Sequence, residues 1–224
     1  GNVIFDHNSF TWSIDEVIGV SLPDHHFQIM TFSNNIIAEP LHDSTHYEGE
    51  PHSMGMLIYG DLDHVALLNN LFASGKDRSP RFDGDYFLIA NNLIYNIISN
   101  RIYMAGSGSV HHDIIGNVHK FGPQSGTSTY VTNIESGVSG ELYIHDNVVP
   151  DGGVDQWAGS QTSSGWWKGD YIVAYGRSSL DDLRSEVPVA SPEGFVPLPG
   201  SLTEEDVLTN VGARPSDRDV VDAR

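Results

Sequence analysis

An asparagine recurs along this chain in one context, with a short apolar run before it and another after it. By subtraction of residue numbers, successive copies lie 27, 35, 22, 25 and 30 residues apart. Repeats of this length with variable insertions indicate a solenoid, because one strand–bend–strand unit cannot bury its apolar side alone and stacked units can. We therefore predict an all-β fold, a right-handed parallel β-helix with long side loops. The repeated asparagines are Asn8, Asn35, Asn70, Asn92, Asn117 and Asn147.

Asparagine suits the bend of such a rung, since it tolerates the left-handed backbone conformation better than most residues. Stacked asparagine side chains also form hydrogen-bonded amide ladders. We therefore expect these asparagines to lie inside one bend of successive rungs. The alternative is an antiparallel sandwich with asparagine turns, which the sequence disfavours because hairpin turns of the Asn-Gly type are missing.

The repeat predicts a single domain over residues 1–224, with rungs over about 1–175 and a C-terminal tail over about 176–224. Within the tail, residues 201–208 predict a short helix that Ser201 opens, with acidic residues in its first turn. An apolar run starts at Val3 without a capping sequence before it, so we expect N-terminal rungs and a cap to be missing. Because an open first rung recruits other strands, we also expect association with another chain there.

The charge of the chain limits its partners. It has 30 Asp and Glu against 11 Lys and Arg, a net charge of −19. Sequence-independent binding of nucleic acid and attraction to anionic membranes both need a basic surface, and no apolar run approaches the roughly 20 residues of a membrane span. We therefore expect no nucleic acid and no membrane as partner. The absence of cysteine excludes disulfides and thiolate metal sites.

The strongest chemical signal is the segment Arg78-Ser79-Pro80-Arg81, which is cationic in an acidic chain. Pro80 removes a backbone donor and disfavours the helical region for the residue before it, so the segment should form a stiff elbow. Two fixed guanidinium groups suit the recognition of carboxylates, to which each offers a planar fork of donors. The alternative is a pair of surface arginines without a ligand.

Three long insertions leave the predicted rungs, and long loops on a rigid scaffold often carry sites. The second, over residues 122–140, is rich in Ser, Thr and Gly, and the third contains Trp166 and Trp167, which would stack on sugar rings or pack within the loop. The first spans residues 39–52 and contains histidines that offer an alternative metal cluster. These histidines are His42, His46 and His52.

Several segments, which together cover most of the chain, resemble the pectate lyases of polysaccharide lyase family 1. Residues 2–16 resemble that family's Asp-His rung, here Asp6-His7, with an acid following shortly after. Residues 69–82 resemble its motif from Asn-Leu-Phe to Asp-Arg-x-Pro-Arg. The resemblance corresponds to the C-terminal two-thirds of the family fold, a right-handed parallel β-helix. Further similar segments lie at residues 35–41, 91–96, 116–123 and 211–224.

The resemblance implies a lyase that cleaves a polyuronate such as pectate by calcium-assisted β-elimination. In this reaction a base removes the proton at C5, beside the carboxylate, and cations stabilise the charge that develops. By resemblance Arg78 is the catalytic base, and an arginine base needs its pKa, ordinarily above about 12, to be lowered by burial and neighbouring cations. The remaining expected site residues are Arg81, His52 and Lys76 for substrate and Asp15 and Glu16 for Ca²⁺.

Two positions depart from the family pattern. Gly19 stands where a second acid is expected, and Met54 stands where a substrate-binding lysine is expected. Two alternatives therefore stay open: a non-catalytic carbohydrate-binding or structural β-helix, and a polygalacturonase-type hydrolase with clustered carboxylates. The resemblance also implies an acidic polysaccharide as partner and secretion, although no signal peptide is visible at Gly1.

Overall fold

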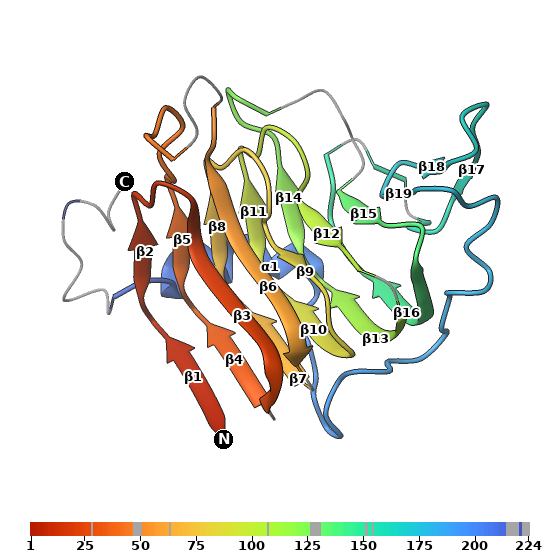
Figure 1. Cartoon of the computed structure of the whole chain (residues 1–224), viewed down its shortest axis with the longest axis horizontal. Helices are drawn as coiled ribbons and strands as arrows, with labels where there is room; N and C mark the ends of the chain where they lie inside the picture. Colours follow the sequence, from red (N-terminus) through yellow and green to blue (C-terminus); the bar gives the residue numbers. More distant parts are fainter. Residues whose placement is uncertain are drawn as a thin grey trace.

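The computed structural model describes residues 1–27, 29–46, 51–62, 64–106, 108–125, 131–150, 152–153, 155–213 and 220. Three sheets run side by side along one axis, and each of the first five turns of the chain adds one strand to each sheet (Figure 1). Strands of successive turns pair in parallel, whereas β18 (Trp167–Gly169) pairs antiparallel with both β17 (Gly159–Gln161) and β19 (Ile172–Ala174). The predicted all-β parallel β-helix is confirmed.

The strands follow one another through the three sheets in a fixed order. The first sheet holds β1 (Asn2–Asp6), β4 (Ile29–Ser33), β7 (His64–Leu68), β10 (Tyr86–Ala90), β13 (Gly108–Ile115) and β16 (Val138–His145). The second holds β2 (Ser9–Thr11), β5 (Ile36–Ala38), β8 (Leu71–Ala73), β11 (Leu93–Tyr95) and β14 (Val118–Lys120). The third holds β3 (Glu16–Phe27), β6 (Met54–Leu62), β9 (Arg81–Phe82), β12 (Ile102–Met104), β15 (Thr132–Ile134), β17 (Gly159–Gln161), β18 (Trp167–Gly169) and β19 (Ile172–Ala174).

Side chains at matching positions of successive rungs stack into columns inside the solenoid. In the first sheet, strand register aligns Phe32, Leu67, Ile89 and Ile114, and each of these is at most 1% exposed. Burial of each such side chain contributes about 1.5–3 kcal/mol relative to exposure. The core is therefore continuous along the axis, as stacking of incomplete units requires.

The repeated asparagines form a ladder of hydrogen bonds at the bend between the first and second sheets. Asn70 is typical: its Oδ1 accepts from the backbone N–H of Asn35 at 2.9 Å and from Asn35 Nδ2 at 3.0 Å. The same pair of bonds links every successive step from Asn8 to Asn147. The predicted stack is confirmed, and we call residues 8, 35, 70, 92, 117 and 147 the asparagine ladder.

The expectation that the ladder asparagines themselves take the left-handed conformation is wrong. That conformation belongs to the residue before each of them, with φ between 53° and 62°. A ladder residue directs both its backbone N–H and its side chain along the axis, so its neighbour makes the turn. The turning residues are His7, Asn34, Asn69, Asn91, Gly116 and Asp146.

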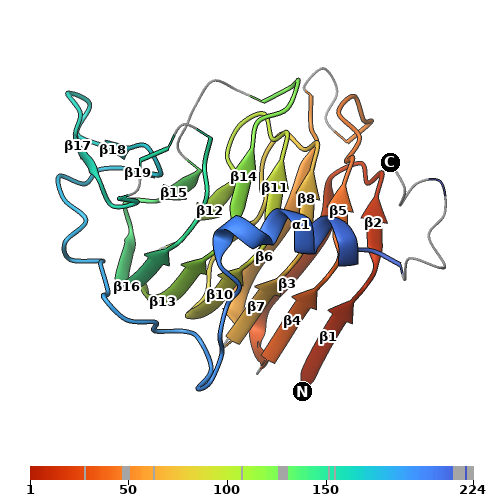
Figure 2. The same cartoon turned by 180° about the vertical axis from the view of Figure 1, so that it is seen from behind.

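The tail returns along the outside of the rungs. The buried Asp113 accepts hydrogen bonds from the backbone N–H groups of residues 189–191. The helix α1 (Gly200–Asn210) then crosses the second sheet, and Gly212 N–H donates to the carbonyl of Asn34 at 2.8 Å (Figure 2). Ser201 lies inside α1 and does not open it, because the helix begins one residue earlier, after Pro199. The end of the tail that resembles the family, at 214–219 and 221–224, lies outside the described residues.

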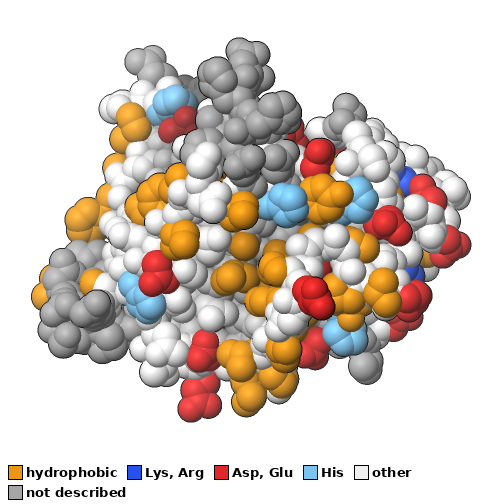
Figure 3. Space-filling model, turned by 90° about the horizontal axis from the view of Figure 1, so that it is seen from below, with side chains coloured by type: hydrophobic (Ala, Val, Ile, Leu, Met, Phe, Trp, Pro, Cys, Tyr) orange, Lys and Arg blue, Asp and Glu red, His pale blue; other side chains and the backbone are white. Residues whose placement is uncertain are grey.

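Strand β1 forms the edge of the first sheet, where Ile4 is 69% exposed and Phe5 stacks on Phe32. Association with another chain at this edge stays a prediction. On the face in Figure 3, acidic, histidine and hydrophobic side chains are interspersed, and the visible Lys and Arg lie at one edge. No helix within the described ranges is long and apolar enough to cross a membrane.

Candidate active site

The elbow that carries Arg78 is built between β8 and β9, where the chain leaves the second sheet and enters the third. Arg78 has φ of 60°, and its backbone N–H donates to Asp77 Oδ1 at 2.6 Å. Its carbonyl accepts from the N–H of Met56 at 2.5 Å. A Cβ on Gly55 would lie 2.5 Å from that carbonyl oxygen, so the approach of the elbow to β6 depends on glycine.

Arg78 and Arg81 line the same groove, which has a volume of about 360 Å³. Their side chains are 23% and 36% exposed, so both guanidinium groups are partly withdrawn from water. Asp15, the expected Ca²⁺ ligand, is not among the residues that line this groove. The other lining residues are Leu57, Ile58, Tyr59, Phe82, Asp83 and Ala105.

Burial lowers the pKa of Arg78 below its ordinary value, and the positive charge of Arg81 lowers it further. The negative charge of Asp15 acts in the opposite direction. In addition, Arg78 Nη1 forms an ion pair with Glu16 Oε1. The side chain of Glu16 is 12% exposed, so this pair is largely shielded from solvent.

Arg81 has partners that the sequence did not indicate. Its guanidinium lies 4.9 Å from the centre of the Tyr103 ring and pairs with Glu135 at 3.5 Å. The Tyr103 hydroxyl donates to Glu135 Oε1 at 2.8 Å, and burial together with this carboxylate raises the pKa of the hydroxyl. Tyr103 lies opposite Arg81 in strand register and opposite Asn133, in the strand that Glu135 follows. Alignment of the rungs was therefore the signal available for finding these partners.

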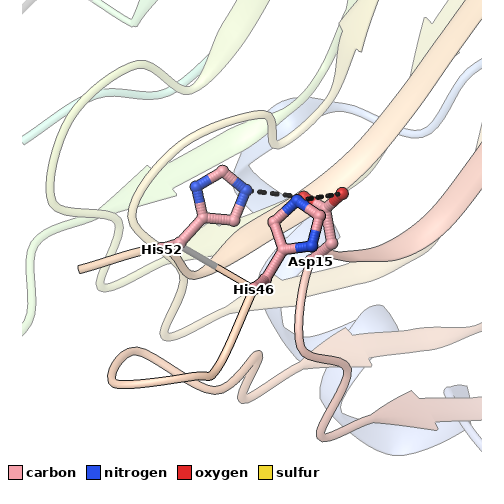
Figure 4. A group of neighbouring side chains, drawn as sticks. All are labelled: Asp15, His46 and His52. Carbon is pink, nitrogen blue, oxygen red and sulfur yellow. Dashed lines mark hydrogen bonds and ion pairs between the residues drawn. The ribbon is translucent and has the colours of Figure 1, made fainter. Parts of the chain in front are cut away.

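Two histidines of the loop between β5 and β6 contact the carboxylate of Asp15 (Figure 4). His52 Nε2 lies 2.5 Å from Asp15 Oδ1, and His46 Nε2 lies 3.1 Å from Asp15 Oδ2. The structure therefore separates the two predicted metal ligands, since Asp15 faces imidazoles whereas Glu16 faces a guanidinium. His42, which the sequence grouped with these histidines, instead contacts Ser53 Oγ at 3.1 Å.

Lys76 and Met54 lie beside this loop and outside the lining of the groove. The Lys76 ammonium donates to the carbonyl of Pro51 at 2.7 Å, and the Lys76 N–H donates to the carbonyl of Ser53. Lys76 thereby fastens the segment that carries His52. Met54 is 8% exposed and belongs to the core, so its side chain offers nothing to a ligand in the groove.

The donors around Asp15 do not fit calcium. Ca²⁺ takes six to eight oxygen ligands, whereas the group that could hold a metal ion in the described part of the chain consists of one carboxylate and two imidazoles. Glu16, the other predicted ligand, already pairs with Arg78. Calcium binding through Asp15 and Glu16 stays a prediction.

Comparison with known proteins finds curated relatives, although neither a family model nor a solved structure matches the chain. Probable pectate lyase C of Emericella nidulans is 31% identical over 215 residues, which are 95% of this chain and 44% of the relative. The proteins of the same name from Aspergillus terreus and Aspergillus flavus are 34% and 32% identical over 150 and 137 residues, which are 65% and 60% of this chain and 30% of each relative. The chain thus spans less than half the length of these relatives, and it is related to the pectate lyase family.

Proposed function

We propose that this chain cleaves a polyuronate such as pectate by β-elimination, with Arg78 as the base. The observation that carries the proposal is the pair of arginines in one groove, where burial and Arg81 lower the pKa of Arg78. A base must be neutral before it takes a proton, and these are the two effects that favour a neutral guanidine. The relatives named pectate lyase support the same class of reaction.

In this proposal Arg81 binds the carboxylate of the reacting uronate through its planar fork of donors. Arg78 removes the C5 proton, the electron pair forms the C4–C5 double bond, and the C4–O bond breaks. The leaving oxygen takes a proton from solvent. Arg81 also lies where negative charge builds on the carboxylate, so it stabilises the transition state. No step runs through calcium, since the described donors do not fit that ion.

Glu16 sets the pH at which such a base would work. Its carboxylate stabilises the charged guanidinium, so we expect a rate that rises with pH as Arg78 loses its proton. Glu16→Gln removes this charge, which should move the rising part of the rate profile to lower pH.

Further parts of the proposal concern substrate binding and location. His52 and Lys76 stay candidates for contacts to the polymer beyond the groove, because Lys76 bonds the carbonyl of Pro51, the residue before His52. We also propose that the protein is secreted, since a polyuronate is too large to enter a cell.

A non-catalytic carbohydrate-binding protein is the second candidate. The Arg78–Glu16 ion pair favours it, because it holds the guanidine in the charged form, and so does Met54 in place of a substrate-binding lysine. A hydrolase has less support, since it needs two carboxylates at the reacting bond and the lining of the groove includes one, Asp83.

One experiment separates these readings. Polygalacturonate is incubated with the chain, with calcium and with chelator, and unsaturated product is followed by ultraviolet absorbance beside a reducing-sugar assay. We expect absorbance and reducing ends to rise together. Arg78→Lys should lose nearly all of the rate of product formation. Arg184→Lys is the control and should retain that rate, because Arg184 forms an exposed ion pair with Glu186. Reducing ends without absorbance would indicate a hydrolase, binding without either product a carbohydrate-binding protein, and full activity of Arg78→Lys would exclude Arg78 as the base.

A further inference from the structure

The side chains of Asp15, His46 and His52 converge at the edge of the third sheet, with all their ligand atoms within 4.8 Å of one another. We propose that these three residues bind one divalent first-row transition metal ion, such as Zn²⁺. The proposal does not depend on the lyase reaction, because it rests on the arrangement of these donors alone.

The geometry of the three donors is close to that of a metal centre. Both imidazoles point Nε2 at the carboxylate, one at each oxygen, over 2.5 and 3.1 Å (Figure 4). A tetrahedral Zn²⁺ holds nitrogen and oxygen at about 2.0–2.2 Å, which places neighbouring ligand atoms roughly 3.3–3.5 Å apart. The ion would therefore replace two hydrogen bonds after small movements of the side chains.

The chemistry of the donor set selects the class of ion. Imidazole nitrogen suits zinc, copper, nickel and iron, and two imidazoles with one carboxylate form a recurrent set for these metals. Calcium prefers oxygen and needs at least six ligands, so it should bind this group weakly. A divalent ion would accept electron pairs from all three groups at once, the two imidazole nitrogens and the carboxylate.

Contacts around the cluster fix two of the three ligands. The N–H of Asp15 donates to Ser13 Oγ at 3.2 Å, and the N–H of His52 donates to the carbonyl of His42 at 2.8 Å. Lys76 ties the residue before His52 through the carbonyl of Pro51. Ligands held in this way need little reordering to bind an ion.

One side of the cluster stays open to solvent. The side chain of His52 is 12% exposed, whereas those of Asp15 and His46 are 33% and 36% exposed. Three protein ligands with an open position are typical of zinc sites that bind a water molecule or a substrate atom, whereas structural sites have four protein ligands. The fourth position would therefore accept an exchangeable oxygen ligand.

The test uses the chelator-treated chain titrated with Zn²⁺ by calorimetry and with Co²⁺ by visible absorption. We expect one tight equivalent of Zn²⁺, a Co²⁺ spectrum typical of tetrahedral coordination, and no competition from millimolar Ca²⁺. Asp15→Asn and His46→Ala should each weaken binding at least tenfold. The exposed position of His46 makes its replacement safe for folding, which circular dichroism verifies.

His7→Ala is the matched control, because His7 also pairs with a carboxylate, Asp6 at 2.7 Å, but no second imidazole joins this pair among the residues that the structure describes. Its binding should equal that of the unchanged chain. The proposal fails if no stoichiometric Zn²⁺ binds, if His7→Ala weakens binding as much as His46→Ala, or if Ca²⁺ displaces the metal. These results stand apart from the lyase assay, so loss of one proposal leaves the other intact.

Discussion

Replacement of Asn70 tests whether the asparagine ladder supports the fold energetically. Asn70→Ala removes the acceptor of the Asn35 N–H and the Nδ2 donor to the carbonyl of Phe32 at 2.9 Å. Asn35 Nδ2 and Asn92 Oδ1 each keep another partner, Phe5 O and the N–H of residue 70. The substitution therefore leaves one backbone group without a partner, the N–H of Asn35, which is fully buried, whereas the carbonyl of Phe32 keeps its place in the pairing of β4 with β7.

An unpaired buried N–H costs about 1–3 kcal/mol, so Asn70→Ala should lower the free energy of unfolding by about 1–3 kcal/mol. The free energy of unfolding of a folded domain is typically about 5–15 kcal/mol, so this loss is measurable. Urea denaturation followed by tryptophan fluorescence measures the loss, provided that the transition is reversible.

Asn8→Ala is the control at the end of the ladder. The side chain of Asn8 donates to Asp6 O and to Asn35 Oδ1, which keeps the N–H of residue 8 as a donor. Asn8 is also less buried than Asn70, so its loss should cost about 0.5–1.5 kcal/mol. Equal losses for Asn8→Ala and Asn70→Ala would refute the argument that orphaned backbone groups set the cost.

Three other predictions concern the elbow, the tail and a buried histidine. Gly55→Ala should push the Arg78 carbonyl away, lower the free energy of unfolding measured in urea by about 1–3 kcal/mol and abolish any lyase rate. Gly19→Ala is the control and should be tolerated, because a Cβ there meets no atom within 4 Å. Asp113→Ala should leave the N–H groups of residues 189–191 unpaired and make the tail sensitive to limited proteolysis, and an unchanged digestion pattern would contradict this. Burial lowers the pKa of His112 from 6.5 to about 4. Below pH 6.5 the unfolded chain therefore binds a proton that the folded chain does not, and the free energy of unfolding should fall by about 3 kcal/mol between pH 6.5 and pH 4. His112→Gln should reduce that pH dependence of unfolding, and an unchanged slope would count against the assignment.

The fold was predictable because its main signal is local. Each ladder asparagine sits between two apolar runs, and stacking follows from that context alone. The shift of the left-handed turn to the preceding residue was not predictable from type, since His7, Asn34 and Asp146 all make it. What these positions share is that each precedes a ladder asparagine, whose backbone N–H and side-chain amide both point along the axis.

The site was predictable only in part, because it depends on which rungs lie side by side. The arginine elbow is a contiguous motif, whereas Arg81 and Glu135 are 54 residues apart in sequence. The sequence grouped His42, His46 and His52 by proximity in one loop, and the structure replaces His42 with Asp15. The register Glu16↔Met54 brings Asp15 beside this loop, and no spacing rule within the loop predicts that alignment.

The returning tail makes this solenoid a structure of fixed length. In most repeat proteins each unit touches its neighbours alone, so units can be added or removed. Here the tail bonds to Asp113, then to Asn91 and finally to Asn34, so its length is matched to the number of rungs that it crosses. Insertion of a single rung would displace its anchor points by one strand spacing of about 4.8 Å, and every contact beyond the insertion would be lost. Duplication of a rung should be tolerated only together with a longer tail.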